Sequence, residues 1–230
     1  MKGKRITWHK LLLQIFGICF AIFTLCSVSF AEELDPRWKW YYSTSYVSEY
    51  FDTNTIEYDA DSQIATVWTV ELNTEGRKIY GTQRQISYAT KKSNVVQSVT
   101  YGLNKTFSHL STKALWTHIP PDSDNEALAN GVASILHINP IYQGGSDRWK
   151  WLHSNDQYGL YIAKDTLAYD PVFPAYTIWA KKVFLNGSTS RVLYYMDLPT
   201  KLVWGDGPVA QPYPESNEEY VYNTVKGMLE

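Results

Sequence analysis

The chain has 230 residues, enough for one large domain or two small ones. With 44% hydrophobic and 19% charged residues, including 9 Trp and 18 Tyr, its composition is that of a folded protein and argues against a disordered chain. It carries 21 basic and 23 acidic residues, and a chain with this balance lacks the cationic surface that nucleic-acid binding requires, so no nucleic-acid partner is expected.

The N-terminus has the pattern of a secretory signal. Four basic residues and no acidic residue lie within the first ten positions, and a largely apolar run follows from Leu11 to Val28. Ser29-Phe30-Ala31 then places small residues at the subsites that signal peptidase reads. We predict that residues 1–31 are a signal peptide cleaved after Ala31, and that the protein is exported to the periplasm, the outer surface or the medium. Because the apolar run approaches the ~18 residues of a membrane span, a retained N-terminal anchor is the alternative, and it is the one membrane contact we expect.

Both cysteines of the chain, Cys19 and Cys26, lie inside this apolar run. After cleavage the mature protein would therefore contain no cysteine. Neither a disulfide framework nor thiol chemistry is expected, even in an oxidising compartment, so stability has to come from packing.

The remainder of the chain contains an internal repeat. Arg-Trp-Lys-Trp at 37–40 recurs at 148–151, and the same offset of 111 residues pairs Trp68 with Trp179. Residues and spacing agree over about 35 positions, which indicates two related units. We expect the repeated tryptophans to lie in the hydrophobic core.

A helix signal closes each unit. Ser123-x-x-Glu126 in the first and Ser216-x-x-Glu219 in the second are capping boxes, in which the serine accepts from the N–H three residues on and the glutamate reaches back to the N–H of the serine. Apolar residues at helical spacing follow each box and predict an amphipathic helix, with stripes formed by Leu128, Val132, Ile135 and Leu136 and by Val221, Val225, Met228 and Leu229. We pair Trp116 before the first box with Trp204 before the second, and the shorter gap in the second unit predicts the loss of about one hairpin.

Between these anchors, apolar and polar residues alternate with period two. The alternation predicts strands at 62–73, 77–90 and 93–101, and Asn186-Gly187 predicts a hairpin. The fold expected is α+β, with two tandem modules, each an antiparallel β-sheet with one C-terminal amphipathic helix packed on one face. The predicted boundaries are residues 37–137 for the first module, 138–147 for a linker and 148–229 for the second, shortened module.

The sequence shows no motif for catalysis or cofactor binding. The histidines that follow the signal occur singly, at 109, 118, 137 and 153, without the spacing of metal ligands. Asp59 and its repeat mate Asp170 could act as an acid and base, but each follows a tyrosine at a predicted strand end, and turn formation explains them better. We predict that the protein is not an enzyme and needs no cofactor or metal; a small hydrolase with dispersed catalytic residues is the alternative.

Candidate binding residues are the aromatic residues that lack a repeat mate, because these are freer to be exposed, together with one basic pair. They are Tyr41, Tyr46, Tyr80, Tyr88, Lys91 and Lys92. The two lysines could meet an acidic partner, but a solvated turn is the interpretation we prefer for them.

Several of these segments together resemble the surface-adhesin protein E family. The resemblance rests on the opening Arg-Trp-x-Trp, Tyr-Phe-Asp-Thr-x-x-Ile at 50–56, the Val-Trp strand at 67–68 and Trp-x-x-Ile-Pro-Pro-Asp-Ser-x-x-Glu at 116–126. The closing segment is the most specific. Residues 37–137 carry the better match, and 148–229 resemble the family through the internal repeat.

The resemblance implies an exported bacterial protein, an antiparallel sheet with a helix on its concave side, and adhesion to host matrix proteins. One departure concerns the helix: the family commonly ties it to the sheet with a disulfide, and this chain has no cysteine after Cys26. We therefore predict an exported envelope or surface binding protein, with a host extracellular-matrix protein as the candidate partner. A periplasmic accessory protein of the envelope is the alternative.

Overall fold

The computed structural model describes residues 35–102, 106–111, 113–205 and 207–230. The predicted signal peptide, residues 1–31, lies outside the described residues. Within the described part, no helix has both the length and the apolar character needed to span a bilayer.

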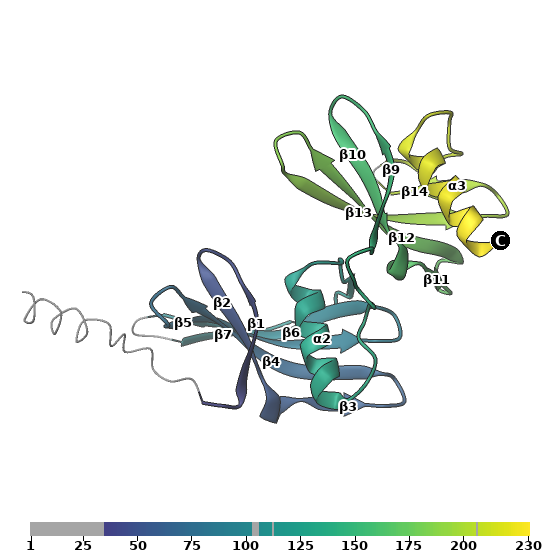
Figure 1. Ribbon diagram of the computed structural model, residues 1–230. Helices are drawn as coiled ribbons and strands as arrows, with labels where there is room; N and C mark the ends of the chain where they lie inside the picture. Colours follow the sequence, from purple (N-terminus) through teal and green to yellow (C-terminus); the bar gives the residue numbers. More distant parts are fainter. Residues whose placement is uncertain (1–34, 103–105, 112, 206) are drawn as a thin grey trace, which may run out of the picture. The chain divides into compact units, whose positions relative to one another are not determined.

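The described chain forms two antiparallel β-sheets, and one helix follows each sheet (Figure 1). This confirms the predicted α+β architecture of two modules. In each module the sheet precedes the helix in the chain, because the strand-forming stretches come before the capping box.

The first sheet has the strand order β1-β2-β4-β5-β6-β7, with β3 paired to β4 and β8 paired to β6. Predicted strands 62–73, 77–90 and 93–101 correspond to β4, β5 and β6. The strands are β1 (Trp38–Ser43), β2 (Val47–Asp52), β3 (Glu57–Asp59), β4 (Ile64–Asn73), β5 (Lys78–Ser87), β6 (Lys92–Tyr101), β7 (Thr106–Leu110) and β8 (Thr117–His118), with the 3-10 helix η1 (Thr53–Thr55) after β2.

The second sheet has the order β14-β13-β12-β10-β9, with β11 paired to β12. Gly187, with a φ of 81°, occupies the turn between β12 and β13, so the predicted Asn-Gly hairpin is confirmed. The strands are β9 (Trp149–Ser154), β10 (Tyr158–Ala163), β11 (Ala168–Asp170), β12 (Ala175–Phe184), β13 (Thr189–Asp197) and β14 (Leu202–Trp204), with the 3-10 helix η2 (Lys164–Thr166) after β10.

The register of the two sheets corrects one detail of the repeat. Strand β14 pairs with β13 in the second module, and β6 pairs with β5 at the same place in the first. Trp204 is the last residue of β14, so its counterpart in the first module lies within β6. Trp116 instead precedes β8. The predicted pairing of Trp116 with Trp204 is therefore wrong. Among the described residues, the second sheet has no strand at the position of β7.

Both helices begin at the predicted capping serines. Helix α2 (Asp124–Leu136) starts after Ser123, whose Oγ accepts from the N–H of Glu126 at 3.2 Å. Helix α3 (Asn217–Leu229) starts in the same way after Ser216. Each serine satisfies one of the free N–H groups at its helix start, which is why the helices begin there.

The glutamates of the two boxes depart from the prediction. Each accepts from the N–H of the residue before the serine, and not from the serine itself. In the first module Asp122 donates to Glu126 Oε2 at 2.6 Å, and in the second Glu215 donates to Glu219 Oε2 at 2.7 Å. Both donors have left-handed backbone, with φ of 56° and 63°, so the chain turns sharply just before each cap.

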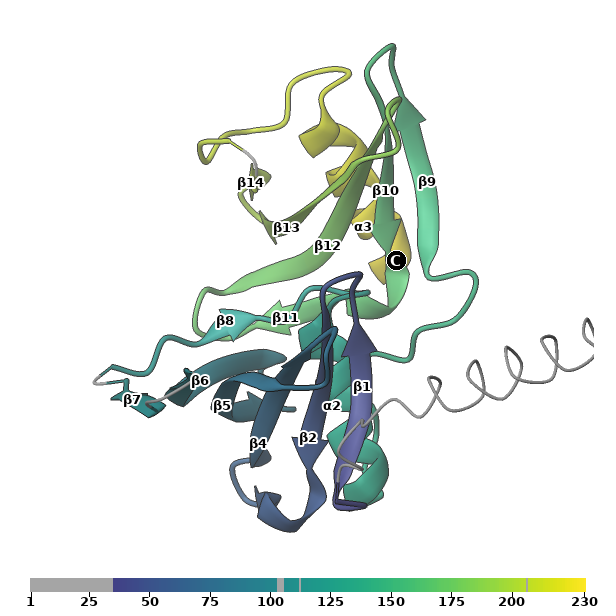
Figure 2. The same ribbon diagram turned by 90° about the vertical axis from the view of Figure 1, so that its left-hand side faces the viewer.

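Each helix lies against its sheet (Figure 2), mainly through the first half of the predicted stripe, and in α2 the partly buried Leu136 also packs against the core. Leu128 and Val132 of α2 are fully buried, as are Val221 and Val225 of α3. Ile135 is 42% exposed, so its predicted core position is wrong. The exposed residues at the end of α3, Met228 and Leu229, repeat this pattern.

The repeated tryptophans do not all lie in the core. Trp179 is buried, but Trp40 and Trp151 are 61% and 56% exposed. Both lie in edge strands, Trp40 in β1 and Trp151 in β9. The residue after Trp40, Tyr41, is buried in the core, and because successive side chains of a strand point to opposite faces, Trp40 faces outward. The expectation that these two tryptophans fill the core is wrong.

The two modules share a hydrophobic cluster. Ala163 and Trp179 of the second module pack in the core of the first, together with Ile141 and Tyr142 from the predicted linker 138–147. Tyr142 is 3% exposed, and its hydroxyl donates to the carbonyl of Ile119 at 2.7 Å. Part of the linker is therefore core, and residues 37–230 form one compact unit.

Candidate functional site

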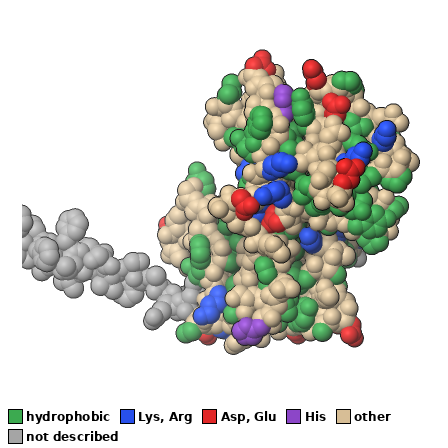
Figure 3. All heavy atoms as spheres, turned by 45° about the vertical axis from the view of Figure 1, so that its right-hand side comes forward, with side chains coloured by type: hydrophobic (Ala, Val, Ile, Leu, Met, Phe, Trp, Pro, Cys, Tyr) green, Lys and Arg blue, Asp and Glu red, His purple; other side chains and the backbone are tan. Residues whose placement is uncertain are grey.

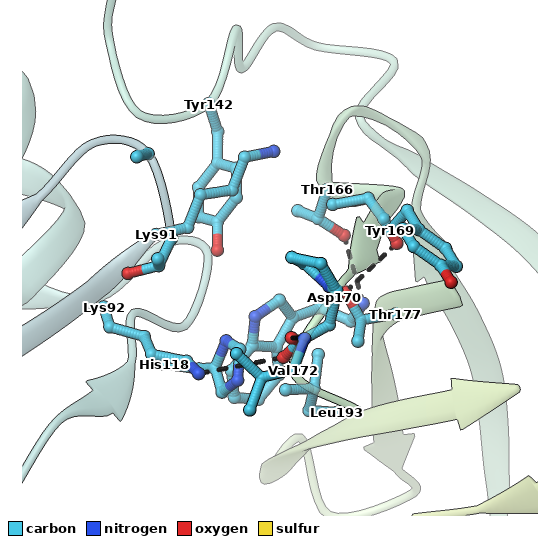
Figure 4. Close-up of a pocket in the computed structure, with 15 residues that line it drawn as sticks. Lys91, Lys92, His118, Tyr142, Thr166, Tyr169, Asp170, Val172, Thr177 and Leu193 are labelled. Atoms are coloured by element: carbon cyan, nitrogen blue, oxygen red, sulfur yellow. Dashed lines mark hydrogen bonds and ion pairs between the residues drawn. The ribbon is translucent and has the colours of Figure 1, made fainter. Parts of the chain in front are cut away.

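A cavity of about 250 Å³ lies where the two modules meet (Figure 4). The turn between β5 and β6, strand β8 and Tyr142 form one side of it. The opposite side comes from the second module, from η2 and β11 to β13. The residues that line it include Lys91, Lys92, His118, Tyr142, Tyr169, Asp170, Val172, Trp179 and Leu193.

Lys92 and Asp170 connect the two sides of the cavity. Lys92 begins β6, and its Nζ lies 3.7 Å from Asp170 Oδ2. Asp170 ends β11, and its Oδ1 also accepts from the N–H groups of Val172 and Phe173 at 2.9 and 3.3 Å. The carboxylate is thus held by the turn that the sequence predicts and is also paired with a lysine from the other module.

Lys91 presents a second ammonium group to the cavity. It occupies a left-handed turn position, with a φ of 56°, and its Nζ lies 5.0 Å from the ring centroid of Tyr142. Burial lowers the pKa of Lys91, and the charge of Asp165 partly opposes this effect. Among the described residues, no carboxylate forms an ion pair with Lys91.

His118 supplies a polar group that remains uncharged at neutral pH. Its Nε2 lies 3.1 Å from the hydroxyl of Tyr195, which joins the modules at a second point. Burial and the nearby charge of Lys92 lower the pKa of His118 to about 4, although Asp170 opposes them. At pH 7 His118 is therefore neutral, and it lies in the cavity wall beside Lys91, Lys92 and Asp170.

The lowered pKa of His118 predicts a loss of stability in acid. The unfolded chain, where the pKa of histidine is about 6.5, binds more protons than the folded chain between pH 6.5 and 4. Stability therefore falls as the pH falls through this window. Replacing His118 with Gln should remove about 2 kcal/mol of this loss, after allowance for solvent screening of a half-buried group.

Urea unfolding at pH 7 and pH 4 measures the difference. His109→Gln, at an exposed position on β7, is the matched control, and it should keep the wild-type pH dependence. Parallel curves for wild type and His118→Gln would show that His118 titrates normally in the folded protein.

A buried ion cluster fixes the junction beside the cavity. The guanidinium of Arg148 lies 2.6 Å from Glu126, 2.9 Å from Asp122 and 3.1 Å from Asp165, and its side chain is 6% exposed. Burial disfavours the charged form, but hydrogen bonds and charge from Glu126 outweigh it, so the pKa of Arg148 is raised. On the face seen in Figure 3, basic side chains lie directly beside acidic ones. Arg148 thus joins the second module to the helix cap of the first.

None of the four predicted tyrosines lines the cavity. Tyr41 is buried, and its hydroxyl donates to Glu49 at 2.5 Å, so the expectation that it is exposed is wrong. Burial raises the pKa of Tyr41. Tyr88 is half-buried and donates to the carbonyl of Ala129 in α2. Tyr80 is half-buried in β5, and Tyr46 is 78% exposed in the turn between β1 and β2.

The structure does bring Lys91 and Lys92 together in the cavity wall. Both are half-buried, so the preferred interpretation of a fully solvated turn is wrong for their side chains. Tyr142 and Trp179 also line the cavity and were not predicted as binding residues, because nothing in their spacing shows that the modules close on each other. The spacing of His118 and Asp170 in the sequence likewise gives no sign that they line the same cavity.

The matched tryptophans form a second surface feature. Trp40 Nε1 donates to Ser43 Oγ at 2.8 Å, and Trp151 Nε1 donates to Ser154 Oγ at 2.9 Å. Each bond satisfies the one polar group of the indole, which leaves the ring faces of these exposed side chains available for apolar contact.

The cavity is suited to binding, since it combines fixed charges with aromatic walls. No cluster of three or more His, Cys, Asp or Glu residues that could hold a metal is found in the part of the chain that the structure describes. A scan against protein-family models found no match for this chain, and neither did searches of curated proteins and of solved structures.

Proposed function

We propose that the protein is an exported binding protein of the bacterial cell envelope or surface that holds a protein partner through exposed aromatic side chains. A host extracellular-matrix protein is the candidate partner, from the resemblance to the surface-adhesin protein E family. The proposal requires no cofactor and no catalytic step.

The matched exposure of Trp40 and Trp151 carries the proposal. Both indoles are more than half exposed at the same position of related edge strands, and each is held by the same hydrogen bond to a serine. Large exposed aromatics leave apolar surface in water, and tryptophan is enriched among the residues that dominate protein interfaces. A feature kept in both modules, where core packing does not require it, is best explained by contact with a partner.

Binding of residues 32–230 to immobilised host matrix proteins, at low and physiological salt, tests this function. Both modules are kept, because Ala163 and Trp179 complete the core of the first. The double variant Trp40→Ala/Trp151→Ala should lower the affinity by roughly tenfold or more, since interface tryptophans typically contribute more than 1 kcal/mol each.

Leu185→Ala is the matched control, because Leu185 is 83% exposed and lies in the turn after β12. It should bind as wild type does. If residues 32–230 bind no better than an unrelated β protein does, the proposed binding to host matrix proteins is wrong. Protease treatment of intact cells then distinguishes a surface protein, which is cleaved, from a periplasmic accessory protein, which is protected. A periplasmic accessory protein should in addition capture envelope proteins in a way that depends on Trp40 and Trp151.

A further inference from the structure

We infer that the cavity between the two modules binds a small aromatic carboxylate. This inference goes beyond the proposed function, because the cavity involves neither Trp40 nor Trp151 and its ligand is a small molecule. Three observations carry it: the volume and walls of the cavity, the lack of an ion-pair partner for Lys91 among the described residues, and the position of Lys91 under the second module.

The volume and the walls of the cavity define the body of the ligand. A cavity of about 250 Å³ is smaller than the range of about 300–1,000 Å³ that is typical for drug-sized ligands, so it suits one ring with a short substituent. The walls are mainly apolar and aromatic: Tyr142 and Trp179 line the cavity, and Figure 4 shows Val172 and Leu193 on its second-module side. A flat apolar ring fits such walls better than a sugar or a phosphate does.

The charges define the substituent. Asp170 is paired with Lys92 and with two backbone N–H groups, so one carboxylate and one ammonium balance each other. Asp165 acts on Lys91 through its charge but forms no ion pair with it among the described residues, and Figure 4 shows the side chain of Lys91 lying along the ring of Tyr142. A half-buried ammonium that contacts the ring of Tyr142 is stabilised by an anion that enters the cavity. A ligand carboxylate would supply that anion.

The position of Lys91 favours a ligand role over a structural one. Lys201 occupies the equivalent turn of the second module, with a φ of 57°, but its side chain is exposed. The turn therefore forms with an exposed lysine just as well. The ammonium of Lys91 differs because the second module closes over it.

Isothermal titration of residues 32–230 with phenylacetate tests the inference, since both hydrophobic cores and the cavity lie within residues 37–230. We expect saturable 1:1 binding with a Kd on the order of 100 µM, as an efficient ligand of about ten non-hydrogen atoms would give. Phenylacetamide, which has the same shape without the charge, should bind roughly tenfold more weakly.

Lys91→Met tests the role of the ammonium, because methionine keeps much of the chain length and adds no branch at the left-handed position. It should abolish the preference for phenylacetate over phenylacetamide, while Lys201→Met should leave that preference intact. Equal affinity for the acid and the amide, or the same change in both variants, would overturn the assignment of Lys91. No saturable binding of phenylacetate would overturn the site as a whole. Since Trp40 and Trp151 are unchanged, matrix binding is measured on the same samples and can fail or succeed independently.

Discussion

Replacing Arg148 with Met should lower the free energy of unfolding by about 3 kcal/mol. The side chain of Arg148 is 6% exposed, and Glu126 and Asp165, which it bridges, are 6% and 11% exposed. Removing the cation leaves two carboxylates in a poorly solvated junction without their partner. That penalty is usually larger than the net contribution of an intact ion pair, because desolvation of the remaining charges is no longer offset.

Urea unfolding followed by circular dichroism at pH 7 measures this loss. Arg37→Met is the matched control, because Arg37 is the repeat mate of Arg148, but its side chain is 41% exposed and pairs with a single carboxylate. That carboxylate, Asp52, is 4% exposed and keeps its hydrogen bond from the N–H of Asn54 when Arg37 is removed. We expect the control to cost about 1 kcal/mol or less. Equal losses in the two variants would mean that the cluster around Arg148 has no special part in joining the modules.

The second large effect is expected in helix α2. Leu128 is 1% exposed and packs in the first core, and the described chain contains no cysteine that could tie the helix to the sheet. Replacing Leu128 with Ala should therefore lower the free energy of unfolding by about 3 kcal/mol, through lost apolar burial and the cavity that remains. Hydrogen exchange should show faster opening of the amides of α2.

Ile135→Ala is the control on the same helix, because its side chain is 42% exposed. It should change the stability by less than about 1 kcal/mol. Similar losses in the two variants would indicate that the exposed Ile135 supports the helix as much as the buried Leu128 does.

The sequence by itself determined the local structure of both modules. Alternating apolar residues predict the strands, because successive side chains of a strand point to opposite faces of a sheet. Ser123 and Ser216 predict the helix starts, because a serine hydroxyl can satisfy an N–H group that the helix leaves free. These are interactions between residues close in the chain, so their spacing is visible in the sequence.

Only the tertiary structure decided how the modules join and where the cavity lies. Arg148 and Arg37 occupy equal positions in the repeat, yet Arg148 is buried among three carboxylates and Arg37 is partly exposed. Likewise, Lys91 lines a cavity and Lys201 is exposed, although they occupy equivalent turns of the two modules. The difference comes from contacts between residues about 20 to 80 positions apart, such as Arg148 with Glu126 and Tyr195 with His118. A repeat pattern records what the modules share, so it cannot show which copy of a residue becomes buried when they pack together.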